Sequence, residues 1–264
     1  MSKVITDTLG DVVKELEAKF EQRVAVPGQY LMARADGRAF HTFTKDMDRP
    51  FDQRMSDAML YTTKSLCHEF NARLGYTQSD EITMCFHYSS GGPSDYPFGG
   101  RLQKMCSLIA AQASVLFYSK ISQSMPGKAS ELPVFDCRVF RAVTLETAID
   151  TFVWREKDAK KNAVSMAASS VYPHKQLEGI PTGERIKMLE AKGISFNNYP
   201  LHFRKGVYFH RQEREMQLDM ATLMKIPEGK APPNGRVIRR SVEKASFESV
   251  LELDDDQRAL LFGC

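Results

Sequence analysis

Cysteine is sparse in this chain and shows no ligand spacing. The five cysteines are Cys67, Cys85, Cys106, Cys137 and Cys264, with no C-x-x-C pair and no Cys/His cluster among them. Such spacings mark metal sites and disulfide frameworks, and their absence, together with the odd count, favours reduced thiols. We therefore expect reduced structural cysteines in a cytoplasmic protein.

Long apolar runs and strong charge are missing as well. No apolar segment is long enough to cross a membrane, and residues 1–20 are charged and amphipathic, without the apolar core of a signal peptide. We therefore expect a soluble protein that does not bind membranes. The net charge of +3 is too small to indicate a nucleic-acid partner, so that only local clusters of basic residues could. With 264 residues, the chain fits one large domain or a core with a sizeable appendage.

Two short apolar runs end abruptly at carboxylates. The first, Tyr30 to Ala35, is followed by Asp36-Gly37-Arg38, and the second leads into Gln78-Ser79-Asp80-Glu81. A strand that ends in an acid places that acid at the rim of a sheet, where water and metal ions reach it. Apolar residues at helical spacing over 54–74 predict a helix of roughly 30 Å between the two runs.

The rest of the pattern predicts the fold class. Helices are predicted over 12–20 and 101–118, strands over 82–86 and 134–140, and a loop over the Gly/Pro/Ser-rich stretch 88–100. The order through residue 140 is strand, helix, strand, strand, helix, strand, which is typical of a ferredoxin-like βαββαβ sheet with helices on one face. A right-handed crossover makes the first two strands parallel, so Asp36 and Asp80 should share one sheet edge. We predict an α+β protein.

The C-terminal half is predicted to be mixed. Thr144 is the expected cap of a helix running through Trp154, and a second helical stretch follows. A short helix is predicted over 182–193, and two short strands, over 206–210 and 236–239, flank a Pro/Gly-rich turn. The pattern therefore divides the chain into residues 1–141 and a mixed α/β extension over residues 142–264.

Two carboxylates at one sheet edge indicate metal chemistry. They can bridge a pair of Mg²⁺ ions whose other ligands are phosphate oxygens and water. One ion would lower the pKa of an attacking hydroxyl, and the other would hold a triphosphate. The simpler alternative is that Asp36 only starts a turn, because Asp-Gly is a common turn pair. The acidic pair Asp80-Glu81 at the matching edge favours phosphoryl transfer.

Three further features fit a nucleotide or nucleic-acid ligand. The backbone of residues 37–41 could wrap phosphates, and Arg101 and Lys104, one helical turn apart, could clamp a triphosphate, although on spacing alone both are better interpreted as solvated charges. His41 could stack on a base, although a lone histidine is more often structural. Basic residues also alternate with aromatic ones over 204–214, a combination that offers charge to phosphates and a stacking surface to bases. The basic residues are Arg204, Lys205, Arg211, Arg214, Arg236, Arg239 and Arg240, with Lys157, Lys160 and Lys161 before them.

These residues carry a resemblance to a known family. Residues 33–43 read A-R-A-D-G-R-A-F-H-T-F and are close to the motif R-x-D-G-R-x-F-H-x-F, and residues 78–81 read Q-S-D-E, the second motif of the same family. F-D-C-R-V at 135–139, Trp154-Arg155, Asp158 and R-K-G at 204–206 also match. Over roughly residues 12–240 the chain resembles the tRNA(His) guanylyltransferase family of 3′–5′ nucleotide polymerases.

The resemblance implies a polymerase- and cyclase-like palm over residues 1–141. It implies two Mg²⁺ ions at Asp36, Asp80 and the Gly37 carbonyl, with Glu81 as a third acid of the catalytic site. The implied nucleotide-binding residues are Asp36, Gly37, Arg38, Ala39, Phe40, His41, Ser79, Asp80, Arg101 and Lys104. The residues expected to contact tRNA are Arg155, Lys157, Lys160, Lys161, Arg204 and Lys205. ATP and GTP would be substrates, and a homotetramer would be the assembly, supported by residues 142–264.

One departure from the family pattern bears on the reaction. Eukaryotic tRNA(His)-specific members carry H-I-N-N-L-Y-N soon after the W-R pair, whereas residues 160–166 read K-K-N-A-V-S-M here. The chain is in this respect similar to the bacterial and archaeal guanylyltransferase-like branch, which extends truncated tRNA 5′ ends with the opposite strand as template. Three alternatives stay open: a true tRNA(His) guanylyltransferase, a palm-type nucleotide cyclase and an RNA-binding module with an inactive site. The basic residues argue against the cyclase, and the intact acids argue against the inactive module.

Overall fold

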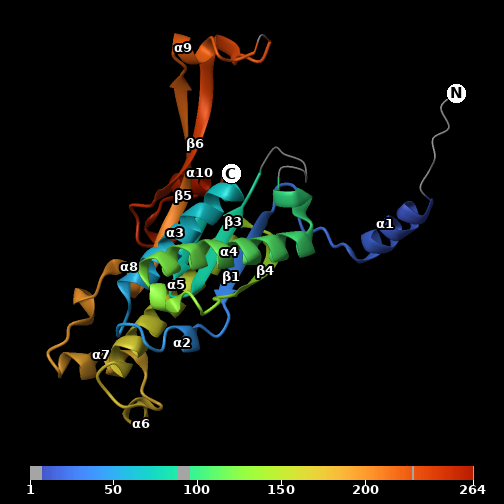
Figure 1. Ribbon diagram of the computed structural model, residues 1–264. Helices are drawn as coiled ribbons and strands as arrows, with labels where there is room; N and C mark the ends of the chain where they lie inside the picture. Colours follow the sequence, from blue (N-terminus) through green and yellow to red (C-terminus); the bar gives the residue numbers. More distant parts are fainter. Residues whose placement is uncertain (1–7, 89–95, 228, 264) are drawn as a thin grey trace.

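The structure, a computed structural model, describes residues 8–88, 96–227 and 229–263 (Figure 1). Within these residues, six strands form one sheet in the order β4-β1-β3-β2-β5-β6, each antiparallel to its neighbours. The strands are β1 (Tyr30–Gly37), β2 (Leu74–Gln78), β3 (Glu81–Phe86), β4 (Phe135–Ala142), β5 (Val207–Gln217) and β6 (Arg236–Lys244). Because β1 and β2 both run antiparallel to β3, they point the same way, as predicted, with β3 between them.

Helices cover both faces of the sheet (Figure 1). The longer helices are α1 (Thr8–Phe20), α3 (Gln53–Glu69), α4 (Leu102–Ser124), α5 (Leu145–Ser169), α7 (Thr182–Glu190) and α10 (Asp255–Phe262). The shorter helices are α2 (Phe40–Phe43), α6 (His174–Leu177), α8 (Leu201–Lys205) and α9 (Met220–Leu223). Short 3-10 turns span Pro97–Gly100, Pro126–Lys128, Phe196–Asn198, Pro233–Gly235 and Val250–Glu252. None of the described helices is long and apolar enough to span a membrane.

The two faces have separate cores: α3 and α4 lie together on one face, as predicted for the βαββαβ unit, and helices beyond residue 142 cover the other face. Leu31 and Ala33 of β1 pack with α3 and α4, whereas Met32 between them packs with Phe152 of α5 and Phe262 of α10. All side chains of β2 and β3 are buried. A sheet that is apolar on both faces has to be covered on both, and α5 supplies the second cover.

Several predicted elements change length. The helix expected over 54–74 ends at Glu69, because the chain turns at Asn71, which has a positive φ of 57°, and Leu74 opens β2. The two helical stretches expected after Thr144 are one helix, α5, which contains neither Gly nor Pro. Most of the loop expected over 88–100 falls at 89–95, outside the described residues.

The C-terminal strands are longer than predicted and continue the sheet. β5 pairs with β2 through Thr77↔Val207 and then forms a hairpin with β6 that projects beyond the body of the molecule (Figure 1). A small third core joins α5 to α7 through Val164, Leu189 and Phe196. Residues beyond 142 therefore complete the sheet, cover its second face and provide one wall for the site described next.

Candidate active site

The end of β1 is fixed by close backbone contacts. Asp36 lies opposite Glu81 of β3 on one side and Asp136 of β4 on the other. The Gly37 N–H donates to the Asp80 carbonyl oxygen at 3.1 Å. A Cβ added to Gly37 would lie 2.4 Å from the Phe40 ring, so glycine is required for this approach. The sequence pattern therefore locates this rim correctly.

The second acid sits in a two-residue turn. Gln78 and Glu81 pair in register, so Ser79 and Asp80 form the connection, and Ser79 takes a positive φ of 48°. The Ser79 hydroxyl donates to Asp80 Oδ1 at 2.9 Å. The backbone bond from Gly37 holds this turn against the end of β1, which brings Asp80 beside Asp36 as predicted.

The two acids form a site of concentrated negative charge. Burial raises the pKa of Asp80, and the negative charge of Asp36 raises it further. In the part of the chain that the structure describes, neither carboxylate has an ion-pair partner, and no group of three or more His, Cys, Asp or Glu side chains could hold a metal. A metal here would therefore depend on the two carboxylates together with backbone carbonyl, water or phosphate oxygens.

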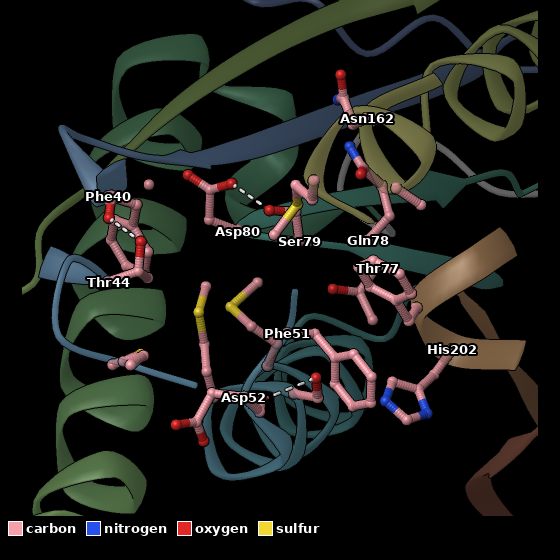
Figure 2. A pocket seen from close by; sticks show the side chains of 18 of the residues that line it. Phe40, Thr44, Phe51, Asp52, Thr77, Gln78, Ser79, Asp80, Asn162 and His202 are labelled. Carbon is pink, nitrogen blue, oxygen red and sulfur yellow. Dashed lines mark hydrogen bonds between the residues drawn. The ribbon is translucent and has the colours of Figure 1, made fainter. Parts of the chain in front are cut away.

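The acids open into a cavity of about 570 Å³, a size ordinary for a small-molecule site (Figure 2). Of the predicted nucleotide-binding residues, those lining it are Asp36, Gly37, Ala39, Phe40, His41, Ser79 and Asp80. Arg38 does not line it, since its side chain is exposed and its N–H donates to the Val134 carbonyl. Figure 2 shows Asp80 and Ser79 on one side and Phe51, Asp52 and His202 on the other.

Other walls of the cavity come from elements that the sequence did not connect with the site. Met55 and Met59 of α3, Asn162 and Met166 of α5, and His202 and Phe203 of α8 line it. The spacing of Met55 and Met59 predicts only a buried helix face. Asn162 is the one residue of 160–166 that matches the H-I-N-N-L-Y-N segment in register, which gives no sign of a place in the cavity. These side chains make much of the wall apolar, which suits a base or sugar better than a phosphate.

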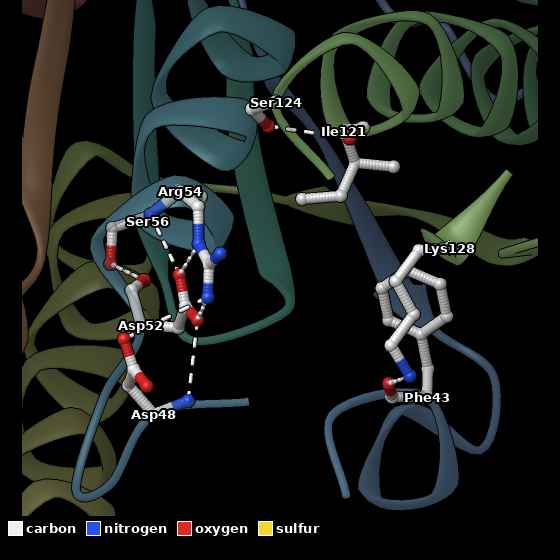
Figure 3. A network of polar contacts seen from close by, with 8 residues as sticks. All are labelled: Phe43, Asp48, Asp52, Arg54, Ser56, Ile121, Ser124 and Lys128. Atoms are coloured by element: carbon white, nitrogen blue, oxygen red, sulfur yellow. Dashed lines mark hydrogen bonds and ion pairs between the residues drawn. The ribbon is translucent and has the colours of Figure 1, made fainter. Parts of the chain in front are cut away.

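A polar network stiffens the loop that enters α3 (Figure 3). Asp52 caps the helix, accepting from the Arg54 N–H at 2.9 Å and from the Arg54 guanidinium at 2.6 and 3.0 Å. The Asp48 N–H donates to the same carboxylate at 3.2 Å. The hydrogen bond from Arg54 is the main reason why the pKa of Asp52 falls to about 2. Nearby, buried Lys128 donates to the Phe43 carbonyl at 2.7 Å, which ties α2 to the turn after α4.

Arg101 and Lys104 lie elsewhere, which corrects their predicted place at the triphosphate. Arg101 pairs with Glu21 at 3.4 Å, and the Lys104 ammonium lies over the Phe98 ring at 5.6 Å. This end of α4 is bonded to residues 22–24, which lead into the start of β1. The acids stand at the other end of that strand, roughly 20 Å away at about 3.3 Å per residue. The spacing of the two residues predicts a shared helix face, but it does not determine the end of the sheet at which that face lies.

Glu81 and Arg155 pair with each other in the interior, which corrects both predicted roles. Arg155 Nη1 donates to Glu81 Oε2 at 2.5 Å, and Arg34 Nε lies 3.7 Å from the same oxygen. Glu81 is 6% exposed and Arg155 5%. Burial raises the pKa of Glu81, with the two guanidinium groups opposing that shift. Neither side chain is positioned to touch a substrate, although Glu81 stands directly behind Asp36.

The remaining residues expected to contact tRNA differ in availability. Lys157, Lys160 and Lys161 are exposed on α5, with no ion-pair partner among the described residues. Arg204 donates to the Tyr199 carbonyl at 2.7 Å, and Lys205 pairs with Glu248 at 2.5 Å. The three lysines are therefore free to meet an anion, whereas Arg204 and Lys205 stabilise the local fold.

Comparison with known proteins bears directly on this site. The family model described as tRNAHis guanylyltransferase matches residues 10–143, which include both acidic motifs. The chain belongs to this family. It is therefore a tRNA nucleotidyltransferase of the guanylyltransferase type, as the motifs predicted.

Relatives match over most of their length. A solved structure of a bacterial tRNA(His) guanylyltransferase-like protein in complex with ATP is 32% identical, with a TM-score of 0.71, over 77% of this chain and 88% of that one. An uncharacterised protein of Acanthamoeba polyphaga mimivirus is 30% identical over 236 residues, 80% of each chain. The tRNA(His) guanylyltransferase of Saccharomyces cerevisiae is 25% identical, over 75% of this chain and 89% of that protein.

Proposed function

We propose that this guanylyltransferase-family protein adds nucleotides to the 5′ end of tRNA in the 3′–5′ direction, with the opposite strand as template. The observation that carries the proposal is the Asp36/Asp80 pair, which faces a nucleotide-sized cavity and has no ion-pair partner in the described part of the chain. The bacterial relative solved with ATP supports ATP as one substrate, and GTP is proposed as another. tRNA would be the partner, in the cytoplasm.

The fold agrees with a palm of the polymerase and cyclase kind. We propose a ferredoxin-like palm for residues 1–141, and the strand order β4-β1-β3-β2 with α3 and α4 as the two crossovers supports it. In this division of labour, residues 142–264 would supply tRNA contacts and assembly. A nucleotide cyclase would share the palm, but it is not favoured, because the family matched by the chain acts on tRNA.

The residues present fit Mg²⁺. Two half-buried carboxylates that repel each other, with no ion-pair partner among the described residues, offer the hard oxygen ligands that Mg²⁺ prefers, and the Gly37 carbonyl would be a third ligand. Bound Mg²⁺ would lower the pKa of an attacking hydroxyl and offset the charge of a triphosphate. The chain itself orients the acids through the Gly37–Asp80 backbone bond and provides apolar walls that exclude water.

Template use is proposed from the altered segment on α5. Of the residues at 160–166, Asn162 lines the cavity, and Lys160 and Lys161 face solvent. Without the H-I-N-N-L-Y-N side chains, we propose that base pairing with the opposite strand selects the nucleotide, while lysines on α5 read the tRNA by its phosphates. The alternative within the family is untemplated addition of G to tRNA(His).

The test is a set of tRNAs that lack their first nucleotide and differ in the opposing base. We expect extension with whichever nucleotide pairs opposite, whether or not the tRNA is tRNA(His). An intact tRNA of the same sequence is the matched control and should not be extended. Addition of G alone, and to tRNA(His) alone, would refute template use in favour of the alternative within the family.

Assembly as a homotetramer is proposed from the resemblance alone. Light scattering at micromolar protein concentration should then give four times the mass of the chain. A monomer with full nucleotide-addition activity would contradict this proposal and leave the assignment of the acids intact.

A further inference from the structure

The single tryptophan of the chain is unusually exposed for its size. Trp154, on α5, is 57% exposed, although large aromatic side chains are usually mostly covered. The Arg155 guanidinium lies 3.5 Å from the centre of its ring, so that one face is supported from below. The exposed surface is therefore on the remaining face and the edges. An aromatic ring held in this way is available to stack on another flat group.

The support beneath this ring is rigid. Arg155 is 5% exposed, and it is held by Glu81 at 2.5 Å and by Asp158 at 3.4 Å. Glu81 lies on β3, directly opposite Asp36 of β1 in the register of the two strands. The tryptophan is therefore tied through two buried side chains to the strand that carries the first acid. Its position relative to the active site does not depend on a loop.

The helix face around Trp154 is basic. Lys157 and Lys161 follow at steps of three and four, which places all three residues along one side of α5. Neither ammonium group has a carboxylate partner among the residues that the structure describes. Of the acids next to Lys157, Glu156 accepts from Tyr208 and Ser249, and Asp158 is engaged by Arg155. Asp150, one turn before Trp154, is an exposed acid on the same side, so the basic part of this face lies on the C-terminal side of the ring.

An exposed aromatic ring flanked by unpaired cations matches the chemistry of single-stranded nucleic acid. Aromatic rings stack on unpaired bases, and the cations neutralise the phosphates between them. A protein surface would be a poorer partner for this face, because two unpaired ammonium groups would have to be desolvated or matched by acids. The same helix lines the cavity through Asn162, next in sequence to Lys161.

We propose that Trp154, with Lys157 and Lys161, forms a stacking platform for an unpaired base of the RNA strand that approaches the Asp36/Asp80 cavity. The proposal rests on the function proposed above and adds to it a specific site for single-stranded RNA. Arg155 is then a positioning residue that supports the ring and does not itself touch RNA.

The first experiment uses the fluorescence of the full-length protein excited selectively at tryptophan, which reports Trp154 because it is the single tryptophan of the chain. A short 5′-phosphorylated oligoadenylate is titrated in, without nucleoside triphosphates, and a blunt, fully paired RNA duplex of equal charge is the matched probe. We expect saturable quenching by the single strand and little by the duplex. Binding of labelled oligoadenylate, seen by anisotropy, without any change in tryptophan emission would overturn the proposal.

The second experiment compares variants. Trp154→Leu should weaken binding of the single strand about tenfold, within the range typical of base stacking on aromatic rings, and Trp154→Phe should retain most of the affinity. Tyr61→Leu is the control, because Tyr61 is 46% exposed on α3 and has the Lys120 ammonium over its ring at 5.7 Å. Equal affinity in Trp154→Leu and Tyr61→Leu would overturn the proposal.

Two further outcomes separate this inference from its neighbours. If tryptophan emission changes with protein concentration in the absence of RNA, the ring lies between copies of the chain and the platform is wrong. If the single strand quenches Trp154 but truncated tRNAs are never extended, the platform stands and the proposed function fails. If truncated tRNAs are extended but tryptophan emission never changes with RNA, the proposed function stands and the platform is wrong.

Discussion

At the scale of single residues, the site is defined by charges held together against their repulsion. Burial and the charge of Asp36 both raise the pKa of Asp80, so the folded state binds a proton there more tightly than the unfolded chain does. For a carboxyl group this means that stability is greatest at low pH and is lost as the pH rises through the raised pKa. At neutral pH the ionised acid therefore destabilises the metal-free fold.

Asp80→Asn should consequently separate stability from function. The variant keeps the hydrogen bond from Ser79 and removes the buried charge, so we expect its urea midpoint at neutral pH, without divalent ions, to rise above that of the wild type. Nucleotide addition should fall by several orders of magnitude, as expected when a metal ligand is lost. Asp150→Asn, an exposed acid on α5, is the control and should change neither quantity. A lower midpoint would contradict the electrostatic account.

Glu81 should behave in the opposite way. Glu81→Gln leaves Arg155 and Arg34 buried without their shared carboxylate, and breaking a buried ion pair from one side costs about 3–5 kcal/mol. Asp158 is also a partner of Arg155, but its side chain is 32% exposed, so Asp158→Asn should cost about 1 kcal/mol or less. The free energy of unfolding in urea measures both. Equal costs for the two variants would contradict the view that the buried Glu81–Arg155 pair stabilises the fold more than the partly exposed Asp158–Arg155 pair does.

At the scale of elements, the stability of the loop that enters α3 and lines the cavity should depend on pH through Asp52. The pKa of Asp52 is lowered to about 2, mainly by the hydrogen bond from Arg54, and a lowered carboxyl pKa contributes stability that is present above the ordinary value of 3.8. This contribution is lost as the pH falls towards the folded-state pKa. The loop from Asp48 to Asp52 should therefore loosen first under acid conditions.

Asp52→Asn tests this contribution, because asparagine still caps the helix but cannot pair with Arg54. We expect the variant to be about 1–2 kcal/mol less stable than the wild type near neutral pH, with a difference that shrinks as the pH falls below about 4. Urea unfolding across that range measures the difference. Asp48→Asn, whose side chain is 81% exposed, is the control and should cost much less than Asp52→Asn near neutral pH. A constant difference for Asp52→Asn would refute the assignment.

The same elements explain how far the sequence could predict the site. Asp36 and Asp80 follow from local signals, because each ends an apolar run and the register of β1, β2 and β3 follows from the element order. Burial of Glu81 by Arg155 could not be predicted, since it joins residues 74 positions apart across the second face of the sheet. That face is covered by α5, a single helix over residues that the pattern divided into two helical stretches.

Two other differences have the same origin. Arg101 and Lys104 share a helix face, but the end of the sheet that they meet depends on the segment before β1, which the pattern did not place. The walls from α3 and α8 were missed because a methionine face of a helix has the same spacing whether it lines a core or a cavity. Local periodicity predicts which face of a helix is apolar, but it does not predict whether that face packs in a core or lines a cavity.

At the scale of the whole molecule, residues 1–141 and 142–264 both contribute strands to one sheet. The helices of the first part cover one face of it, and the helices of the second part cover the other. Met32 and Tyr76 pack under α5 and α10, and the outer edge of β2 is paired with β5. A fragment of residues 1–141 would expose this face and edge, so we expect it to aggregate or to lack a cooperative unfolding transition. Circular dichroism in urea checks this. Cooperative unfolding of the isolated fragment would show instead that residues 1–141 fold independently.

The central claim is that Asp36 and Asp80 carry out nucleotide addition at the 5′ end of tRNA. The most direct measurement incubates a tRNA that lacks its first nucleotide, with C as the opposing base, with the protein, Mg²⁺, ATP and GTP, and resolves the product length on a sequencing gel. We predict growth by one nucleotide at the 5′ end with the wild type, and none with Asp36→Asn or Asp80→Asn at equal folded concentration. No growth with the wild type, or equal growth with either variant, would contradict the account.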